Sequence, residues 1–241
     1  MTRVFVTAAC APGIEVDLEP DDARHLSRVL RMHPGDEIVV ISARFAWRAT
    51  LTAIEDDRAC AIIVAPYLGY RSGELPVPIT VLQAVPKGMK MDDVVEKIVE
   101  LGAAAIQPIR CARSYGGDSR SKLERWQRIA RAAARQSHRL IEPSVLEPVR
   151  FSDALAYARV TTKVLIAYER AEPQSLATAL RACDDGPLSI VVGPEGSFTD
   201  GELQLARDAG AELVSLGPTI LRTETAAAAM LAAIAALRGW W

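Results

Sequence analysis

Two glycine-containing segments in the C-terminal part of this 241-residue chain carry residue types suited to binding a small, positively charged ligand. In the first, the apolar run 190–192 leads into Gly193-Pro194-Glu195-Gly196. Glycines let backbone groups approach a ligand without a Cβ in the way. A carboxylate between them is a poor neighbour for a phosphate but a good one for a sulfonium or an amine, as in S-adenosylmethionine. The alternative is a plain strand-to-helix connection with Thr199 or Asp200 as N-cap.

The second segment, 216–226, passes through a Gly-Pro turn and apolar residues into a polar helix start. Backbone groups of such a loop can read the edge of an adenine while Ile220 and Leu221 pack on its face. Arg222 and Glu224 could instead form only an ion pair at the helix start. Neither segment has the glycine pattern of dinucleotide or P-loop sites, so nicotinamide and nucleoside triphosphate chemistry lose their main support.

A basic tract precedes both segments. Residues 86–139 contain twelve Lys and Arg against six Asp and Glu, although the whole chain has a formal net charge of -2. Arg128, Arg131, Arg135 and Arg139 recur every three or four residues, which places them on one face of a helix. Arginines in this arrangement can bind phosphates bidentately, or they can form an ordinary solvated face. The first of these alternatives would mean a nucleic-acid partner.

Cysteine and histidine usage gives no sign of a metal. The four cysteines are far apart with no C-x-x-C pair, and the three histidines form no metal-binding pattern. We expect reduced thiols and no bound metal. The first residues lack a signal-peptide pattern, and the longest apolar run, 226–237, is too short to cross a bilayer. These features predict a cytoplasmic protein that does not bind a membrane.

Periodicity divides the chain into a small unit at residues 1–70, a Pro/Gly-containing linker at 71–78 and an α/β domain at 79–241. The first unit is predicted to be a compact barrel with a helix at 23–32 and strands at 37–42, 46–54 and 59–65. In the second, strands alternate with helices, as a mostly parallel sheet requires. The expected strands are 79–85, 105–109, 163–168, 188–193 and 212–216, and the expected helices are 91–101, 122–137, 175–182, 200–209 and 223–237.

Taken together, these segments resemble the RsmE family, ribosomal RNA small subunit methyltransferase E, of the SPOUT superfamily of knotted methyltransferases. The resemblance spans nearly the whole chain, and the order and spacing of its motifs make it specific. They are Arg3-Val4-Phe5-Val6, His25-Leu26-Ser27-Arg28-Val29-Leu30-Arg31, Pro86-Lys87-Gly88-Met89-Lys90-Met91-Asp92, Lys97-Ile98-Val99-Glu100-Leu101-Gly102, Arg125-Trp126, Arg135-Gln136-Ser137-His138-Arg139, Gly193-Pro194-Glu195-Gly196, and Leu216-Gly217 through Thr225-Ala226.

The resemblance implies a PUA-like RNA-binding β-barrel, an α/β domain with a trefoil knot, and a homodimer. It also implies transfer of a methyl group from S-adenosylmethionine to N3 of a uridine in 16S ribosomal RNA, either free or in the small subunit. Two departures from the family pattern stand out, because Ser197 replaces a second glycine and Thr219 replaces an arginine. Ser197 is a mild change if its backbone angles are ordinary. Thr219 removes a charge from the loop and with it any substrate contact made there.

The residues that match the motifs receive expected roles. Arg222 is the candidate for stabilising the uracil anion, with Glu195 or Glu224 as proton acceptor or orienting group. The expected cofactor-binding residues are Ala167, Tyr168, Val192, Gly193, Pro194, Glu195, Gly196, Leu216, Gly217, Ile220, Leu221, Arg222 and Thr225. The expected RNA-binding residues are Arg3, His25, Arg28, Arg31, Lys87, Lys90, Arg113, Arg135, Gln136 and Arg139.

Two other functions remain open at this stage. The chain could be another SPOUT enzyme that modifies a different nucleotide, such as a transfer RNA ribose. It could also be a non-catalytic RNA-binding assembly factor whose cofactor pocket is degenerate through Ser197 and Thr219. Binding of S-adenosylmethionine separates the enzymes from the assembly factor, and mapping the modified nucleotide separates the enzymes from each other.

Overall fold

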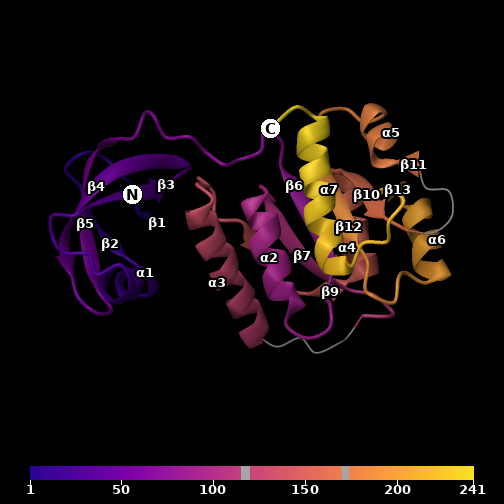
Figure 1. The fold of residues 1–241 in the computed structure, drawn as a ribbon, viewed down its shortest axis with the longest axis horizontal. Coiled ribbons are helices and arrows are strands. Elements are labelled where there is room, and N and C mark those ends of the chain that lie inside the picture. Colours follow the sequence, from indigo (N-terminus) through magenta and orange to yellow (C-terminus); the bar gives the residue numbers. More distant parts are fainter. Residues whose placement is uncertain (115–119, 170–173) are drawn as a thin grey trace. The chain divides into compact units, whose positions relative to one another are not determined.

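The computed structural model describes residues 1–114, 120–169 and 174–241, which form two compact units (Figure 1). The first consists of Met1–Glu74 and Ala134–Glu142, and the second of Leu75–Ala133 and Pro143–Trp241. The chain passes from the first to the second between Glu74 and Leu75, inside the stretch expected to be a linker. Residues 134–142, which the sequence analysis assigned to the α/β domain, belong to the first unit.

The first unit is built on a sheet of order β1-β3-β4-β5-β2. Here β1 runs parallel to β3, and the other pairs are antiparallel. Side chains that alternate along the strands form its core with Leu26. The strands are β1 (Arg3–Phe5), β2 (Glu15–Leu18), β3 (Glu37–Ser42), β4 (Phe45–Ile54) and β5 (Ala59–Pro66), of which the last three confirm the predicted strands.

The helix of this unit starts earlier and ends sooner than predicted. It begins as α1 (Pro20–Arg24), with proline in its first turn, and continues as a π-helical turn, η1 (His25–Val29). Arg31 then adopts a positive φ of 52°, which helical residues do not have, so the expected extension to residue 32 is wrong. The short strands β1 and β2 were not predicted, because three or four residues give little alternation to detect.

Buried ion pairs hold residues 134–142 in the first unit. Asp22 is 1% exposed and pairs with Arg135, and Arg139 is fully buried with its guanidinium 2.6 Å from the Glu74 carboxylate. The same carboxylate accepts hydrogen bonds from the backbone N–H groups of Leu140 and Ile141, each at 2.9 Å. Since breaking a buried pair leaves an uncompensated charge, these contacts fix the segment strongly.

The second unit contains a parallel sheet of order β11-β13-β10-β12-β6-β7-β8, with β9 also paired to β7. Its strands are β6 (Ile79–Ala84), β7 (Ala105–Arg110), β8 (Ser144–Val145), β9 (Val149–Arg150), β10 (Lys163–Ala167), β11 (Gln174–Ser175), β12 (Leu188–Val192) and β13 (Glu212–Ser215). Its helices are α2 (Lys90–Glu100), α3 (Arg120–Gln136), which runs on into the first unit, α4 (Phe151–Thr161), α5 (Leu176–Arg181), α6 (Asp200–Asp208) and α7 (Thr223–Leu237).

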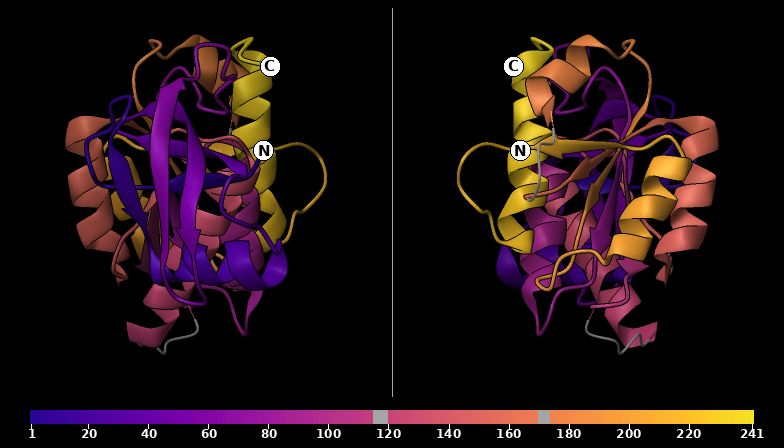
Figure 2. Two further views of the ribbon diagram at one scale, coloured as in Figure 1. Left: turned by 90° about the vertical axis from the view of Figure 1, so that its left-hand side faces the viewer. Right: turned by 90° about the vertical axis from the view of Figure 1, so that its right-hand side faces the viewer.

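Helices cover both faces of this sheet, α2 and α7 on one side and α4 and α6 on the other (Figures 1 and 2). The predicted strands and helices are confirmed within a few residues. Helix α4 was not predicted, although its buried residues Phe151, Ala154, Leu155 and Ala158 follow helical spacing. In the described part of the chain, no helix has the length and apolar character needed to span a membrane.

Parallel pairing brings the carboxyl ends of three strands to one edge. Ala167 of β10 lies in register with Val192 of β12 on one side and with Val214 of β13 on the other. The loops that leave these strands therefore start side by side, which is where ligands bind in α/β sheets. Figure 2 shows the loop between β13 and α7 bulging away from the sheet at this edge.

Gly102 provides a test of the close packing after α2. It follows the C-cap with a φ of +101°, and an added Cβ would lie 2.5 Å from Cγ of Leu75. We expect Gly102→Ala to lower the free energy of unfolding by about 2–4 kcal/mol, from the positive φ and the clash together. Urea denaturation followed by circular dichroism measures it.

Gly210, which follows α6, is the matched control. Its φ is +78°, but no atom lies within 4 Å of an added Cβ. Gly210→Ala should cost only the backbone part, about 1–2 kcal/mol. Equal losses of unfolding free energy in the two variants would show that Leu75 does not restrict the side chain at residue 102.

Candidate functional site

A cavity of about 370 Å³ lies at the carboxyl edge of the parallel sheet. Glu195 and Leu221, from the two loops singled out in the sequence, both line it. The end of β10 completes the wall, with Ala167 and Tyr168. The remaining lining residues are Lys90, Glu169, Val192, Gly193, Pro194, Ser197, Phe198, Ser215, Leu216, Gly217, Pro218, Thr219, Ile220, Arg222, Thr223, Glu224 and Ala226. Of the expected cofactor-binding residues, Gly196 and Thr225 alone are not in the lining.

The first loop is shaped by a tight turn and a helix cap. Ser197 donates its backbone N–H to the Pro194 carbonyl at 2.9 Å, which closes the turn. A Cβ on Gly193 would lie 2.7 Å from the ring of Phe198, so glycine is needed there. Thr199 is the N-cap of α6 and forms a capping box with Glu202, which settles the choice between Thr199 and Asp200. The loop is thus both a helix connection and a cavity wall.

Ser197 departs from the expectation of an ordinary backbone. Its φ is +59°, in the left-handed region where glycine is favoured, and its hydroxyl is buried without a hydrogen-bond partner among the described residues. A residue other than glycine in this conformation is strained. The replacement of the family's second glycine is therefore not mild for stability.

The second loop is tied to the first by one hydroxyl. Thr223 Oγ1 donates to the carbonyl of Gly193 at 2.6 Å and accepts from Nε2 of Gln83 at 3.0 Å. Gln83 is fully buried in β6, and its Nε2 also donates to the Ala84 carbonyl at 2.9 Å. Thr223 is the first residue of α7, so this chain of hydrogen bonds fixes the helix start against the end of β12.

A lysine joins two carboxylates at the cavity. Lys90 Nζ lies 3.5 Å from a Glu195 oxygen and 3.3 Å from a Glu224 oxygen, and Glu195 also accepts the backbone N–H of Lys87 at 3.1 Å. The pKa of Glu224 is below its ordinary value, first because its own backbone N–H bonds the carboxylate, and also because Lys90 lies beside it. Both loops therefore present negative charge that is fixed by α2.

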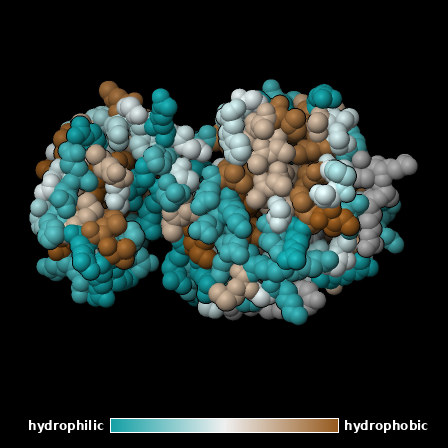
Figure 3. All heavy atoms as spheres, viewed as in Figure 1, coloured by the Kyte–Doolittle hydropathy of each residue, from teal (hydrophilic) through white to brown (hydrophobic). Residues whose placement is uncertain are grey.

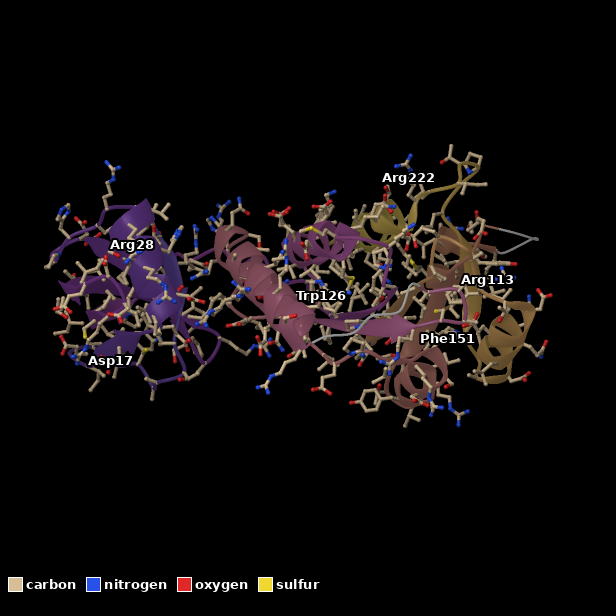
Figure 4. The ribbon with its side chains drawn as sticks, turned by 90° about the horizontal axis from the view of Figure 1, so that it is seen from below. Asp17, Arg28, Arg113, Trp126, Phe151 and Arg222 are labelled. Atoms are coloured by element: carbon tan, nitrogen blue, oxygen red, sulfur yellow. The ribbon has the colours of Figure 1, made fainter. Side chains whose placement is uncertain are left out.

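Arginines border this site in different ways. Arg222 lines the cavity and is exposed at the start of α7, where Figure 4 labels it. Arg113 Nη1 donates to the carbonyl of Gly196 at 2.9 Å, and a Cβ on Gly196 would lie 3.1 Å from the Arg113 side chain. Gly196 thus lets Arg113, an expected RNA contact, pack on the first loop.

The other expected RNA-binding residues separate into exposed and internal groups. Arg139 is fully buried against Glu74, and Arg135 pairs with the buried Asp22, so neither guanidinium is available at the surface to bind RNA. Arg3 is half-buried, and Lys90 belongs to the cavity. The exposed members are His25, Arg28, Arg31, Lys87, Arg113 and Gln136.

Four residues of the cavity lining, Lys90, Glu169, Phe198 and Thr223, were not predicted to belong to it. Lys90 was assigned to RNA, because nothing in its spacing revealed that α2 faces the two glutamates. Glu169 follows the predicted strand end and could have been included with Tyr168. Phe198 and Thr223 act through packing and hydrogen bonding, which a motif does not reveal.

Comparisons with known proteins agree with this arrangement. A model of the RNA methyltransferase domain matches residues 73–235, and a model of the RNA methyltransferase PUA domain matches residues 18–64. Ribosomal RNA small subunit methyltransferase E of Synechocystis is 36% identical over 225 residues, which cover 92% of this chain and 73% of the relative. The protein of that name from Bacillus subtilis is 32% identical over 224 residues, covering 89% and 87%.

The fold is similar to solved structures over nearly its whole length. Ribosomal RNA small subunit methyltransferase E from Neisseria gonorrhoeae, bound to S-adenosyl methionine, is 36% identical with a TM-score of 0.87, and the match covers 98% of both chains. A methyltransferase from Legionella pneumophila in complex with the same cofactor is 27% identical with a TM-score of 0.87, covering 98% and 97%. The predicted class, an α/β domain preceded by a PUA domain, is confirmed.

Thr223 gives the first test of this site. Thr223→Val keeps the shape of the side chain but leaves the Gly193 carbonyl and one Gln83 donor without a partner. We expect a loss of about 1–3 kcal/mol in the free energy of unfolding. Denaturation in urea measures it, and Thr223→Ser, which keeps the hydroxyl, should lose less than half as much. Equal losses for both variants would show that the methyl packing, and not the hydroxyl, matters.

Ser197 gives the second test. We expect Ser197→Gly to raise the free energy of unfolding by about 1 kcal/mol, because it relieves the left-handed strain and removes an unpartnered buried hydroxyl. Thermal denaturation should show a higher Tm. Ser144→Gly, at an exposed strand position with ordinary φ, should lower it. A lower Tm for Ser197→Gly would contradict the strain argument.

Proposed function

Because this chain belongs to the RsmE family of ribosomal RNA methyltransferases, we propose that it transfers a methyl group from S-adenosylmethionine to N3 of a uridine in 16S ribosomal RNA. The observation that carries the proposal is that both glycine-containing loops line the same cavity. Its volume of about 370 Å³ is within the usual range of small-molecule sites. The names and the bound cofactor of the relatives support the same reaction class.

The cavity residues fit the proposed cofactor. The bound group would supply an electrophilic methyl on a sulfonium. Glu195 provides a carboxylate suited to that positive charge or to the ammonium. Ile220 and Leu221 provide apolar contact area for an adenine, and the backbone of 215–219 provides donors and acceptors for its edge. Gly217, where nothing lies within 4 Å of an added Cβ, leaves this backbone open to a ligand.

Arg222 is the proposed stabiliser of the reacting base. The imide nitrogen of uracil becomes a good nucleophile only when its proton leaves, and the negative charge then spreads to the uracil oxygens. A guanidinium beside those oxygens favours the anion. Arg222 lines the cavity and is exposed. In the part of the chain that the structure describes it forms no close ion pair, although its charge contributes to the lowered pKa of Glu224. Its charge is therefore available to a substrate.

The two glutamates have different proposed tasks. The pKa of Glu224 is lowered by its own backbone N–H and by Lys90, which makes it a weak proton acceptor and an orienting group. Glu195 lies on the opposite loop and remains the candidate that accepts the N3 proton. Lys90, placed between them, positions both carboxylates. Gly196 and Thr225, which do not line the cavity, are proposed to support the two loops and not to contact the cofactor.

The RNA surface and assembly are also proposals. In the first unit, the exposed His25, Arg28, Arg31 and Gln136 are the proposed RNA-binding residues together with Arg3, and in the second unit they are Lys87 and Arg113. The internal Arg135 and Arg139 are left out. A ribosomal substrate implies a cytoplasmic enzyme. The superfamily's trefoil knot is proposed for the loops after β12 and β13. The proposed PUA-like domain is residues 1–70, followed by a linker at 71–78 and the methyltransferase domain at 79–241, with residues 134–142 added to the first unit by their packing.

A homodimer is supported by the surface of α7. The half-buried side chains on its outer side are alanines, Ala228, Ala229, Ala232 and Ala233, and Figure 3 shows apolar atoms over this helix. A helix that is apolar all round is normally buried. Burial against a second copy of the chain satisfies that condition next to the cavity, because α7 begins with Thr223 and Glu224.

Arg222→Ala tests the proposed function. We expect methyl transfer to fall at least about 100-fold, since one charge-stabilising donor is lost. Cofactor affinity should stay within threefold. The measurements are transfer of labelled methyl to small-subunit RNA and calorimetry with S-adenosylmethionine. Arg207→Ala, an exposed arginine on α6, is the control that should change neither. Loss of both methyl transfer and cofactor affinity would assign Arg222 to cofactor binding. If the unmodified protein did not bind S-adenosylmethionine, the proposed methyltransferase activity would be refuted.

A further inference from the structure

The first unit carries a cluster of aromatic rings that the proposed reaction does not use. Tyr67 and Tyr70 lie in the segment after β5, with ring centroids 5.7 Å apart and an interplanar angle of 70°. His138, from the segment after α3, stacks on Tyr70 with centroids 6.0 Å apart and an angle of 29°. Three rings from two distant parts of the sequence thus form one continuous series.

The backbone holds these rings in place. The Tyr70 N–H donates to the Tyr67 carbonyl at 3.0 Å and closes a turn, and the Gly73 N–H donates to the His138 carbonyl at 3.0 Å. A Cβ on Gly73 would lie 2.4 Å from the Ser137 carbonyl oxygen, so only glycine allows this approach. His138 itself has a φ of +63°, a costly conformation for a residue other than glycine. The strain places its ring against Tyr70.

The outer side of the series is open and apolar. His138 is exposed, and Leu68, at the tip of the turn between the tyrosines, is 96% exposed. The Tyr67 N–H donates to the Ala46 carbonyl at 2.8 Å, which puts the turn next to Phe45, itself 66% exposed. Single exposed apolar residues are common, but these two lie beside the turn that carries the tyrosine rings. The exposed ring of His138, at one end of the series, is where another ring can stack.

Positive charge borders this surface. The Arg3 guanidinium contacts Nε2 of His138, and because arginine can only donate, that nitrogen must be the acceptor of a neutral ring. Burial and the charge of Arg3 both lower the pKa of His138, which agrees with the neutral form. Arg44 and Arg71 are exposed in the adjoining loops. The surface therefore combines stacked rings with the exposed guanidinium groups of Arg44 and Arg71, which can contact phosphates.

We propose that Tyr67, Tyr70 and His138, bordered by Leu68 and Arg3, form a stacking site for an unpaired base of the RNA substrate. Unpaired bases stack on aromatic side chains, and their phosphates are held by nearby arginines. A paired base has no free face, so the site selects a loop or a splayed nucleotide. The proposal rests on the proposed function, because it takes RNA as the ligand, but it concerns a second contact outside the methyl-transfer cavity.

His138→Gly in the full chain tests the site. Glycine removes the ring and suits the φ of +63°, so the fold should be retained. Anisotropy with a labelled unpaired 12-nucleotide RNA should show affinity reduced by at least about fivefold, the loss of one stacking contact. The slope of affinity against salt should not change, because no phosphate contact is removed. His138→Phe, which keeps a ring, should bind within twofold of the unmodified protein.

His33→Gly, at an exposed histidine elsewhere in this unit, is the matched control and should leave affinity unchanged. If His138→Gly lowers RNA affinity by less than twofold, the stacking site is overturned. That result is expected if the surface binds a protein partner instead of RNA. A loss accompanied by a shallower salt slope also overturns it, since the ring would then act through a phosphate. Methyl transfer and cofactor calorimetry on the unmodified chain are scored separately, so failure of the reaction is not mistaken for failure of the stacking site.

Discussion

The arrangement of the cavity depends on the hydroxyl of Thr223. It donates to the carbonyl of Gly193 and accepts from the buried amide of Gln83, so one side chain joins β6, the end of β12 and the start of α7. Each of these backbone and amide groups would be costly to bury without a partner. Because the bonds are made inside the protein, the two loops are held together before any ligand arrives, and the entropy of ordering them is lost on folding.

A second constraint is electrostatic. Glu195 and Glu224 come from different loops, and two carboxylates near one cavity would repel each other without a cation between them. Lys90 supplies that cation from α2, and the backbone of Lys87 adds a hydrogen bond to Glu195. The result is an acidic cavity that suits a positively charged cofactor, with the exposed Arg222 left for a substrate that becomes negative as it reacts.

The arginines show that one residue type serves two purposes in this protein. In α3 and the segment after it, Arg135 pairs with the buried Asp22 and Arg139 with the half-buried Glu74, which holds residues 134–142 in the first unit. Others, such as Arg28 and Arg113, remain at the surface. A buried guanidinium is stable only with a carboxylate partner, so the positions of Asp22 and Glu74 decide which arginines are internal and which stay at the surface.

The sequence by itself determined the order of the main strands and helices, because apolar periodicity is local, and it located both glycine-containing loops at strand ends. It also placed the change of unit within a Pro/Gly stretch. It missed α4, the shortest strands and the left-handed backbone of Ser197, which depend on packing and on turn geometry. Only the tertiary structure decided that Lys90 belongs to the cavity and that Arg135 and Arg139 are internal. Those outcomes follow from which charged groups become neighbours on folding, and partners more than fifty residues apart leave no periodic trace in a sequence.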